Sequence, residues 1–467
     1  MKETSPSKFA AALILPLALL FTACSPPFMA NFGDTVIQET RSFYAVNMIT
    51  SRFYLINAVK LAESEHCIVY ADEKVNVSYK TAEAIAGEYE AKIYTQITDT
   101  FGMFEDVDGN GKLILLLLDI IDGYGGAQSS YVAGFFQSYH LFKKSTNYQY
   151  QYSNEADMLF LDTNPLEPGS ESFYSTLAHE FQHLINFSQT TLKDGRMEDI
   201  WIDEGLATAA EYVYNGHQKA RIDFFNQDPY RSIRYGNNFF VWDGDWESGT
   251  GGSYDPVANY ATDYLFFQWL RIHANNGVGI YKDIIGSRYR DYRAVTEVAQ
   301  NRIDASLGDW ETLLRTWLLA NAYNKTGGLL GYKGEIETTF KPIVGATRSL
   351  APGEGVFSRI GLSGTDDSFE SSSASGNIRY AGLNPSSEDE SDIAGPVYNG
   401  QYLLTFNVNS NNSGSSETGY LAQGSEHSVS GSILMGRTLG EETEPTLLGP
   451  FPIDVQFNPD GTKQGRQ

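Results

Sequence analysis

Two histidines four residues apart constrain this chain more than any other feature of its sequence. They are His179 and His183 in the segment TLAHEFQHLINF, residues 176–187, and the 467 residues include only 7 histidines. Apolar residues recur around them at helical spacing: Phe173, Leu177, Phe181, Leu184 and Ile185. Because residues four apart lie on one face of a helix, we expect both imidazoles to point in the same direction.

Glu180 completes the pattern HExxH. Two imidazoles on one helix face suit a tetrahedral zinc ion, and Glu180 is rotated about 100° from His179 around the helix. It can therefore hold a metal-bound water molecule instead of the metal itself, which is why HExxH is typical of zinc peptidases. The alternative is a surface helix that carries two hydrogen-bonded histidines.

A catalytic zinc ion takes three protein ligands and leaves one position for water. A third histidine would stand in an HxxGxxH run, but Asn186 and Gln189 occupy the glycine and histidine positions. A glutamate on a second helix is the other solution, and IWIDEGLATAAEYVY, residues 200–214, supplies Glu204. Asp203 is the competing carboxylate, but the pattern WxxEG favours Glu204.

The HEFQH motif, the spacing to Glu204 and the WIDEGLA text together resemble the gluzincin zinc metallopeptidases, and most closely the hyicolysin-type family of secreted bacterial enzymes. The resemblance covers residues from about 50 to about 325. It implies an α+β fold, with a mixed α/β half that has an edge strand above the site, and a helical half beyond the zinc. It also implies that His179, His183 and Glu204 bind one zinc ion, with Glu180 as general base and proton shuttle.

Glu211 is the residue that the same resemblance assigns to orienting a zinc-bound histidine. It follows Glu204 by seven residues, two turns along one helix face, where aminopeptidase-N-like gluzincins also have a glutamate. Thermolysin-like enzymes use an aspartate at the position that Thr208 occupies here. The alternative is a solvated helix charge.

The oxyanion of the transition state needs a hydrogen-bond donor. The segment NYATDYLFFQWL, residues 259–270, resembles an aminopeptidase-like helix that presents a catalytic tyrosine, and Tyr260 matches its register. Tyr264, His217 and His273 are the other candidates, and a packing role for the tyrosines is the alternative.

A strand at residues 156–162, ADMLFLD, is expected at the sheet edge, where it would bind the substrate backbone by strand addition. No signature of an anchor for a substrate amino terminus is present, which favours an endopeptidase over an exopeptidase.

An acidic turn, EDVDGNGK at residues 105–112, places oxygen donors at Asp106, Asp108 and Asn110. The spacing matches the first half of an EF-hand loop, but Leu117 stands where the bidentate glutamate should be. An EF-hand is therefore excluded, and either a non-helical calcium loop or a simple DG/NG turn is left.

The amino terminus has the pattern of a bacterial lipoprotein signal. Residues 1–23 contain a short apolar run that ends in small residues, and Cys24 would be the first residue after cleavage and would carry the acyl chains. An ordinary cleaved secretory signal is the alternative. The only other cysteine, Cys67, would then have no disulfide partner and would be a small buried residue in a strand.

The remaining chain divides into four predicted parts. They are a tether at 24–45, an α/β part with the HExxH helix at 46–190, a helical part at 191–340, and a β-rich or partly disordered region at 345–467. We expect strands at 53–59, 67–70, 112–120 and 156–162, and helices at 81–100, 171–188, 197–214, 257–274, 292–302 and 309–323.

A formal net charge of −25 argues against nucleic acid as a partner, because phosphate contacts need clustered lysine and arginine. These features predict a zinc endopeptidase for protein or peptide substrates, anchored to the bacterial cell envelope at the outer membrane or cell surface. A surface-binding, adhesin-like lipoprotein on an inactive scaffold, and a zinc hydrolase for esters or epoxides, are the alternatives. The oligomeric state is open.

Overall fold

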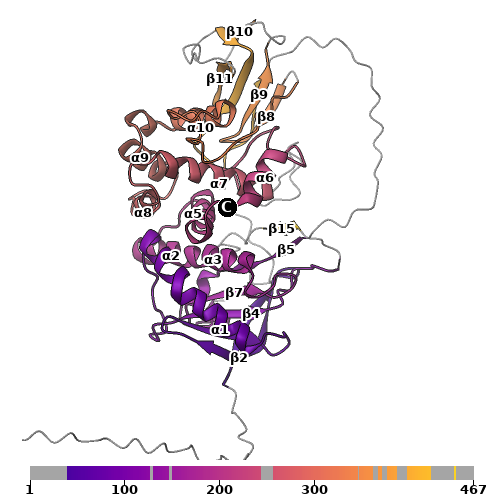
Figure 1. Ribbon diagram of the computed structural model, residues 1–467, viewed down its shortest axis with the longest axis vertical. Helices are drawn as coiled ribbons and strands as arrows, with labels where there is room; N and C mark the ends of the chain where they lie inside the picture. Colours follow the sequence, from indigo (N-terminus) through magenta and orange to yellow (C-terminus); the bar gives the residue numbers. More distant parts are fainter. Residues whose placement is uncertain are drawn as a thin grey trace, which may run out of the picture. The chain divides into compact units, whose positions relative to one another are not determined.

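The computed structural model describes residues 39–126, 130–146, 150–242, 256–344, 347–360, 367–370, 376–385, 397–421 and 446–448 (Figure 1). These residues belong to one compact unit that begins at Glu39. The signal segment, Cys24 and most of the tether lie outside the described residues.

A six-stranded mixed sheet forms the amino-terminal part. Its strands lie in the order β1 (Thr40–Asn47), β2 (Arg52–Glu63), β3 (Cys67–Asp72), β4 (Leu113–Leu118), β7 (Met158–Asp162) and β6 (Gly134–Phe135). The first three strands pair antiparallel, β3, β4 and β7 are parallel, and β6 is antiparallel to β7. Every residue of β4 is buried, as expected for an apolar strand in the middle of a sheet that is covered on both faces.

Two expectations for this sheet are corrected. The strand at 156–162 is not at the edge, because Gly134 and Phe135 of β6 pair with its outer side, opposite Leu161 and Phe160. A two-residue strand has no sequence periodicity that could reveal it. The tether expected over 24–45 is also too long, since β1 begins at Thr40 and pairs with β2 along its whole length.

Helices cover one face of the sheet. The helix expected at 81–100 is α1 (Tyr79–Glu88), a π-helical turn (Tyr89–Ile93) and α2 (Tyr94–Phe101), and these pack beside α3 (Glu171–Gln189). Alternate sheet residues such as Leu115 and Leu117 belong to the main hydrophobic core under these helices. Their neighbours Ile114 and Leu116 face a second, smaller core with β1 and β2. Cys67 is buried in the main core.

The second part of the molecule is helical. It contains α4 (Thr191–Asp194), α5 (Ile200–Asn215), α6 (Lys219–Gln227), α7 (Pro256–His273), α8 (Gly279–Ile285), α9 (Tyr292–Arg302) and α10 (Trp310–Tyr323). Helix α5 packs against α3 on one side and α7 on the other (Figure 1). Short 3-10 helices span Ser138–Leu141, Tyr150–Tyr152 and Ala305–Gly308.

Gly205 allows α5 and α7 to pack closely. A Cβ atom at this position would lie 2.0 Å from Cε2 of Phe267, so only glycine fits without a shift of the α7 side chain. The close contact matters for the site because Glu204 is the preceding residue on α5.

Short strands dominate the described residues of the carboxy-terminal region. They are β8 (Thr347–Leu350), β9 (Gly355–Arg359), β10 (Asp367–Glu370), β11 (Ile378–Leu383), β12 (Val397–Gly400), β13 (Tyr402–Asn407), β14 (Glu417–Tyr420) and β15 (Thr446–Leu448), which pairs with β5 (Ser130–Val132). Phe357, Leu404 and Phe406 share the main hydrophobic core with α10, so the described strands pack on the helical part.

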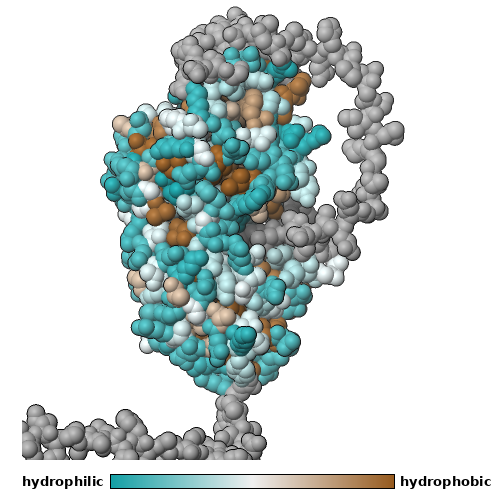
Figure 2. Space-filling view, in the orientation of Figure 1, coloured by the Kyte–Doolittle hydropathy of each residue, from teal (hydrophilic) through white to brown (hydrophobic). Residues whose placement is uncertain are grey.

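The face shown in Figure 2 is largely hydrophilic, with apolar residues in separate small groups. Among the residues that the structure describes, no helix is long and apolar enough to cross a bilayer.

Candidate active site

Helix α3 is a buried helix with a capped start. The side chain of Ser170 accepts a hydrogen bond from the N–H of Phe173, and Glu171 lies in the first turn, where a negative charge favours the helix dipole. His179 and His183 are 1% and 0% exposed, between the sheet and α5. The alternative placed the two histidines on a surface helix, whereas both are buried here.

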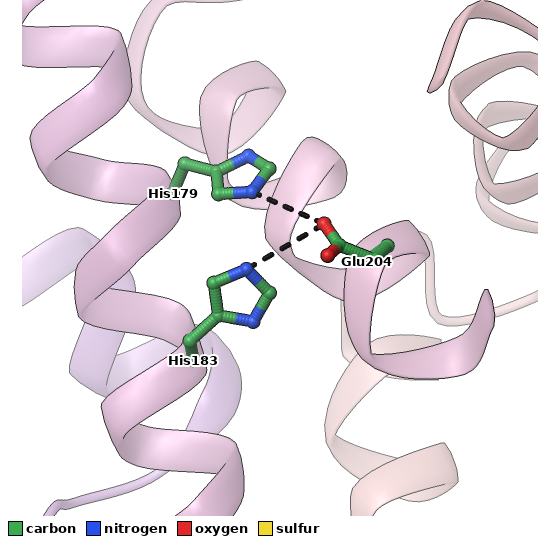
Figure 3. A group of neighbouring side chains, drawn as sticks. All are labelled: His179, His183 and Glu204. Carbon is green, nitrogen blue, oxygen red and sulfur yellow. Dashed lines mark ion pairs between the residues drawn. The ribbon is translucent and has the colours of Figure 1, made fainter. Parts of the chain in front are cut away.

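His179, His183 and Glu204 meet at one point (Figure 3). Oε2 of Glu204 on α5 lies 3.5 Å from Nε2 of His179 and 3.6 Å from Nε2 of His183. Ligand atoms of all three residues lie within 4.8 Å of one another. Two ligands that bind zinc at about 2.0–2.2 Å are separated by less than this distance, so a small adjustment would bring all three onto one ion.

The ligand atoms have no other partner. Nε2 of both histidines and both carboxylate oxygens of Glu204 are buried and accept or donate no hydrogen bond in the described part of the chain. Buried polar atoms are nearly always paired, so this set of nitrogen and oxygen atoms fits a metal ion. Burial alone would raise the pKa of Glu204, but the charges of the nearby His183 and His179 lower it, which favours the anionic form.

Glu211 orients His179. Its Oε1 lies 2.8 Å from Nδ1 of His179, and Arg221 contacts both of its oxygens, with Nε 2.9 Å from Oε2. Glu211 is only 6% exposed, so the alternative of a solvated helix charge is wrong. Burial would raise its pKa, but Arg221 and His179 lower the pKa of Glu211 to about 2. A carboxylate of this kind fixes the tautomer that leaves Nε2 free for metal.

Asp203 takes the equivalent place on His183. Its Oδ2 lies 2.9 Å from Nδ1 of His183, and Asn186 donates a hydrogen bond to its other oxygen. Asp203 therefore lies on the Nδ1 side of the imidazole, whereas the ligand atoms meet at Nε2. This position does not suit Asp203 as a zinc ligand. Sequence reasoning missed this orienting role, although an aspartate directly before Glu204 was the available signal.

Glu180 lies beneath the edge strand β6. It is fully buried, neither of its carboxylate oxygens has a hydrogen-bond partner among the described residues, and burial raises its pKa to about 7. A Cβ atom at Gly134 would lie 3.2 Å from Cγ of Glu180 and 3.0 Å from the carbonyl oxygen of Phe160. Glycine therefore lets β6 pass directly over the carboxylate.

Tyr260 is the candidate oxyanion donor that the structure brings to the histidines. Its ring lies 6.2 Å from the ring of His179, and the guanidinium of Arg221 lies 5.2 Å from its centroid. The hydroxyl of Tyr264 instead accepts a hydrogen bond from the N–H of Gln218, at 2.9 Å.

The two lesser histidine candidates have partners elsewhere. His217 lies 3.6 Å from a carboxylate oxygen of Glu335, and Nε2 of His273 lies 2.8 Å from the carbonyl oxygen of Gly331. Their contacts are with the segment after α10, so they are not brought to the ligand cluster.

Asp263 was not anticipated. It lies on α7 one turn after Tyr260, is fully buried, and neither of its oxygens has a partner in the described part of the chain. Burial raises its pKa well above the usual value, and the charge of Glu204 raises it further.

Two of the three residues expected to form a calcium loop, Asp106 and Asp108, lie in a cluster with a residue from outside the acidic turn. Asp106 and Asp108 meet Asp157, which precedes β7, within 4.8 Å. Asn110 donates a hydrogen bond from Nδ2 to Asp108, and its Oδ1 accepts one from the N–H of Lys112. This cluster is separate from the histidine site in its ligands and in the elements that carry them.

A comparison with known proteins shows that the chain is similar to a metalloprotease. The neutral metalloprotease ShpI of Staphylococcus hyicus is 30% identical over 333 residues, which are 68% of this chain and 72% of that protein. No protein-family model matches the sequence.

Proposed function

The chain belongs to the metalloprotease family of ShpI, and we propose that it is a zinc-dependent endopeptidase acting on protein substrates. The observation that carries the proposal is the buried trio of His179, His183 and Glu204, whose ligand atoms meet without any other partner. Two imidazoles and one carboxylate are a ligand set that zinc uses in peptidases, with a fourth position for water.

Zinc at this site would lower the pKa of a bound water molecule toward ~7 and place positive charge beside the scissile carbonyl. Glu180 is the general base: its buried carboxylate has both oxygens available, and its pKa is raised to about 7 by burial. It takes a proton from the water as the oxygen attacks, and it then gives this proton to the amine that leaves. A pKa near the working pH suits both steps.

Two further residues act on the substrate in this proposal. The hydroxyl of Tyr260 donates a hydrogen bond to the oxyanion, since its ring is already packed against His179. The substrate backbone pairs with the outer edge of β6, to which no described strand is paired. Strand addition in the middle of a peptide suits endopeptidase cleavage.

The location of the enzyme is a proposal from the sequence alone. Cleavage before Cys24 and acylation of that residue would anchor the enzyme to the bacterial cell envelope, outside the cytoplasm. A Cys24→Ala variant should then move from the membrane fraction to the soluble fraction. An unchanged distribution would reject the lipid anchor without touching the peptidase proposal.

The proposed function is tested by metal content and hydrolysis together. Purified protein from residue 25 onward is compared with Glu180→Gln and His183→Ala, using plasma mass spectrometry for zinc and casein for cleavage. We expect about one zinc per chain in the parent and in Glu180→Gln, and none in His183→Ala. Loss of the general base should lower kcat about 10²- to 10⁴-fold.

His217→Ala is the matched control, because His217 pairs with Glu335 in the segment after α10 and is not brought to the ligand trio. It should keep both zinc and activity. Zinc without cleavage of any peptide in a library would favour binding of surface partners or another hydrolase reaction. Absence of zinc from the parent would overturn the proposal.

A further inference from the structure

We propose that Asp106, Asp108 and Asp157 form a calcium site that joins the loop before β4 to the start of β7. The inference does not depend on peptidase activity, because none of these residues contacts the histidine site.

The three carboxylates are close enough to share one ion. One oxygen from each residue lies within 4.8 Å of the other two. Calcium binds oxygen at about 2.3–2.6 Å, so two oxygens on the same ion are separated by at most about twice that distance. The side-chain oxygen of Asn110, backbone carbonyls and water would complete the six to eight ligands that calcium takes.

The loop is already folded around Asp106. Its Oδ1 accepts hydrogen bonds from the N–H groups of Gly109 and Asn110 at 2.9 and 3.1 Å, and its Oδ2 accepts one from Gly111 at 2.9 Å. Gly109 and Gly111 have φ values of 74° and 70°, which glycine adopts without strain. Oδ1 thus accepts two bonds and Oδ2 only one, which leaves a lone pair on Oδ2 free for a cation.

Asp157 is the independent observation that points to a ligand. It is fully buried, its Oδ1 accepts a hydrogen bond from the N–H of Val107 at 3.1 Å, and its Oδ2 has no partner among the described residues. A buried carboxylate oxygen without a partner is costly unless a proton or a cation satisfies it. Asp157 comes from a segment about fifty residues away, so the loop alone does not account for its position.

The charge of Arg41 acts on Asp108, but without a direct ion pair. Among the described residues, no lysine or arginine forms an ion pair with Asp106, Asp108 or Asp157. The nearby Lys112 bonds instead to the carbonyl oxygens of Ser64 and Glu65.

The pKa values agree with this geometry. Burial raises the pKa of Asp157 to about 7, and the charges of Asp108 and Asp106 add to the effect. Ligand chemistry selects the ion, because a set made only of oxygen atoms suits calcium, whereas zinc prefers nitrogen and sulfur.

The proposed ion would fasten two central strands at the same end. The N–H of Ile114 in β4 donates to the carbonyl oxygen of Asp157, at 3.0 Å, and β4 and β7 continue from there in parallel. The N–H of Glu105, at the start of the loop, donates to the hydroxyl of Ser188 near the end of α3, at 3.2 Å. Calcium would therefore stabilise the part of the sheet on which α3 packs.

The test is thermal unfolding of the full chain carrying Glu180→Gln, which prevents self-cleavage. Calcium is removed with a chelating resin, zinc content is checked by plasma mass spectrometry, and CaCl₂ or MgCl₂ is then added. At a hundredfold excess of calcium over Kd we expect the melting temperature to rise by about 3 °C, with a smaller rise in magnesium. Titration calorimetry should give a Kd on the order of 10⁻⁴ M, as for extracellular calcium modules.

Asp157→Asn separates a calcium site from a simple turn. The amide keeps the acceptor for Val107 and removes the buried charge, so without calcium this variant should melt no lower than its parent, and it should lose the calcium response. Asp99→Asn, at an exposed position on α2, should keep the full response. If Asp157→Asn does not fold, Asp108→Asn and the parent's own titration provide the same test. No calcium-dependent rise in the parent, or a rise that Asp157→Asn retains, would overturn the proposal.

Discussion

The histidine cluster (His179, His183 and Glu204) and the acidic cluster (Asp106, Asp108 and Asp157) hold their ligand groups by different means. In the histidine cluster, α3 and α5 supply all three groups and also the carboxylates that orient the two imidazoles. In the acidic cluster, backbone N–H groups of a loop hold the carboxylates. Helix packing therefore fixes the first cluster, and local chain geometry fixes the second.

The two sets of ligand groups would suit different cations. Nitrogen ligands with orienting carboxylates suit zinc, and an all-oxygen set on a loop suits calcium. The residues around each cluster also differ. Glu180 follows His179 on α3, and the ring of Tyr260 lies near that histidine, whereas neither residue belongs to the acidic cluster. We therefore expect substitutions near the histidines to change catalysis and zinc binding, and substitutions near the loop to change only stability.

The largest effect should come from Tyr260→Phe. Loss of the Tyr260 hydroxyl removes the proposed oxyanion donor, so kcat should fall about 10²- to 10³-fold with unchanged zinc content. Peptide hydrolysis and plasma mass spectrometry measure the two quantities. Tyr264→Phe, one turn further along α7, is the control and should lose much less. Equal losses would mean that the packing of α7, and not the Tyr260 hydroxyl, supports activity.

A smaller effect is expected from Glu211→Gln. The amide cannot hold the His179 tautomer as firmly, so zinc affinity should fall about 10- to 100-fold in a competition with a chromophoric chelator. Glu83→Gln, at an exposed position on α1, should have no effect. The rise in melting temperature with calcium should be unchanged in both variants. Loss of that rise in Glu211→Gln would show that the two clusters are coupled.

Gly205→Ala tests whether helix packing positions Glu204. The added methyl group would meet the ring of Phe267, so the free energy of unfolding should fall by about 1–3 kcal/mol, and zinc affinity should fall with it. Gly87→Ala, in α1 with open space around the Cβ position, should instead raise the free energy of unfolding by about 0.5–1 kcal/mol. Urea unfolding measures both changes. A neutral Gly205→Ala would contradict the role of the α5–α7 contact.

The smallest effect is expected from Lys112→Met. Its contacts with Ser64, Glu65 and Glu63 are partly exposed, so stability should change by less than about 1 kcal/mol. Calcium affinity by titration calorimetry should stay the same, because Lys112 does not pair with the carboxylates. A clear gain in calcium affinity would show that this lysine partly neutralises the acidic cluster.

Short sequence patterns predicted most helix positions and the face of α3 on which the histidines lie. The helix at 292–302 matches α9, and the mixed α/β character of the fold was also expected. The spacing of His179 and His183 placed both on one face of α3, and the metal-binding group with Glu204 followed from one further helix. These features depend on residues close in sequence, whose geometry a helix fixes.

Features that depend on tertiary pairing were missed. Strand β6 has only two residues, so its place at the sheet edge comes from pairing with β7 and not from its own sequence. Asp157 joins the acidic turn only because β4 and β7 are neighbouring parallel strands. Asp263 is brought near Glu204 because α7 packs on α5. No motif in the sequence around Asp263 predicted this packing. The anchor at Cys24 is still a prediction.

The ligands His179, His183 and Glu204 all lie between residues 179 and 204, whereas Tyr260 is on a helix that comes much later in the chain. Contacts between segments that are close in sequence form early, because little loop entropy is lost. A folding chain can therefore assemble its metal site when α3 and α5 meet, before α7 docks. In the enzyme that we propose, zinc would then bind before Tyr260 is in place, and hydrolysis would begin only after α7 has docked.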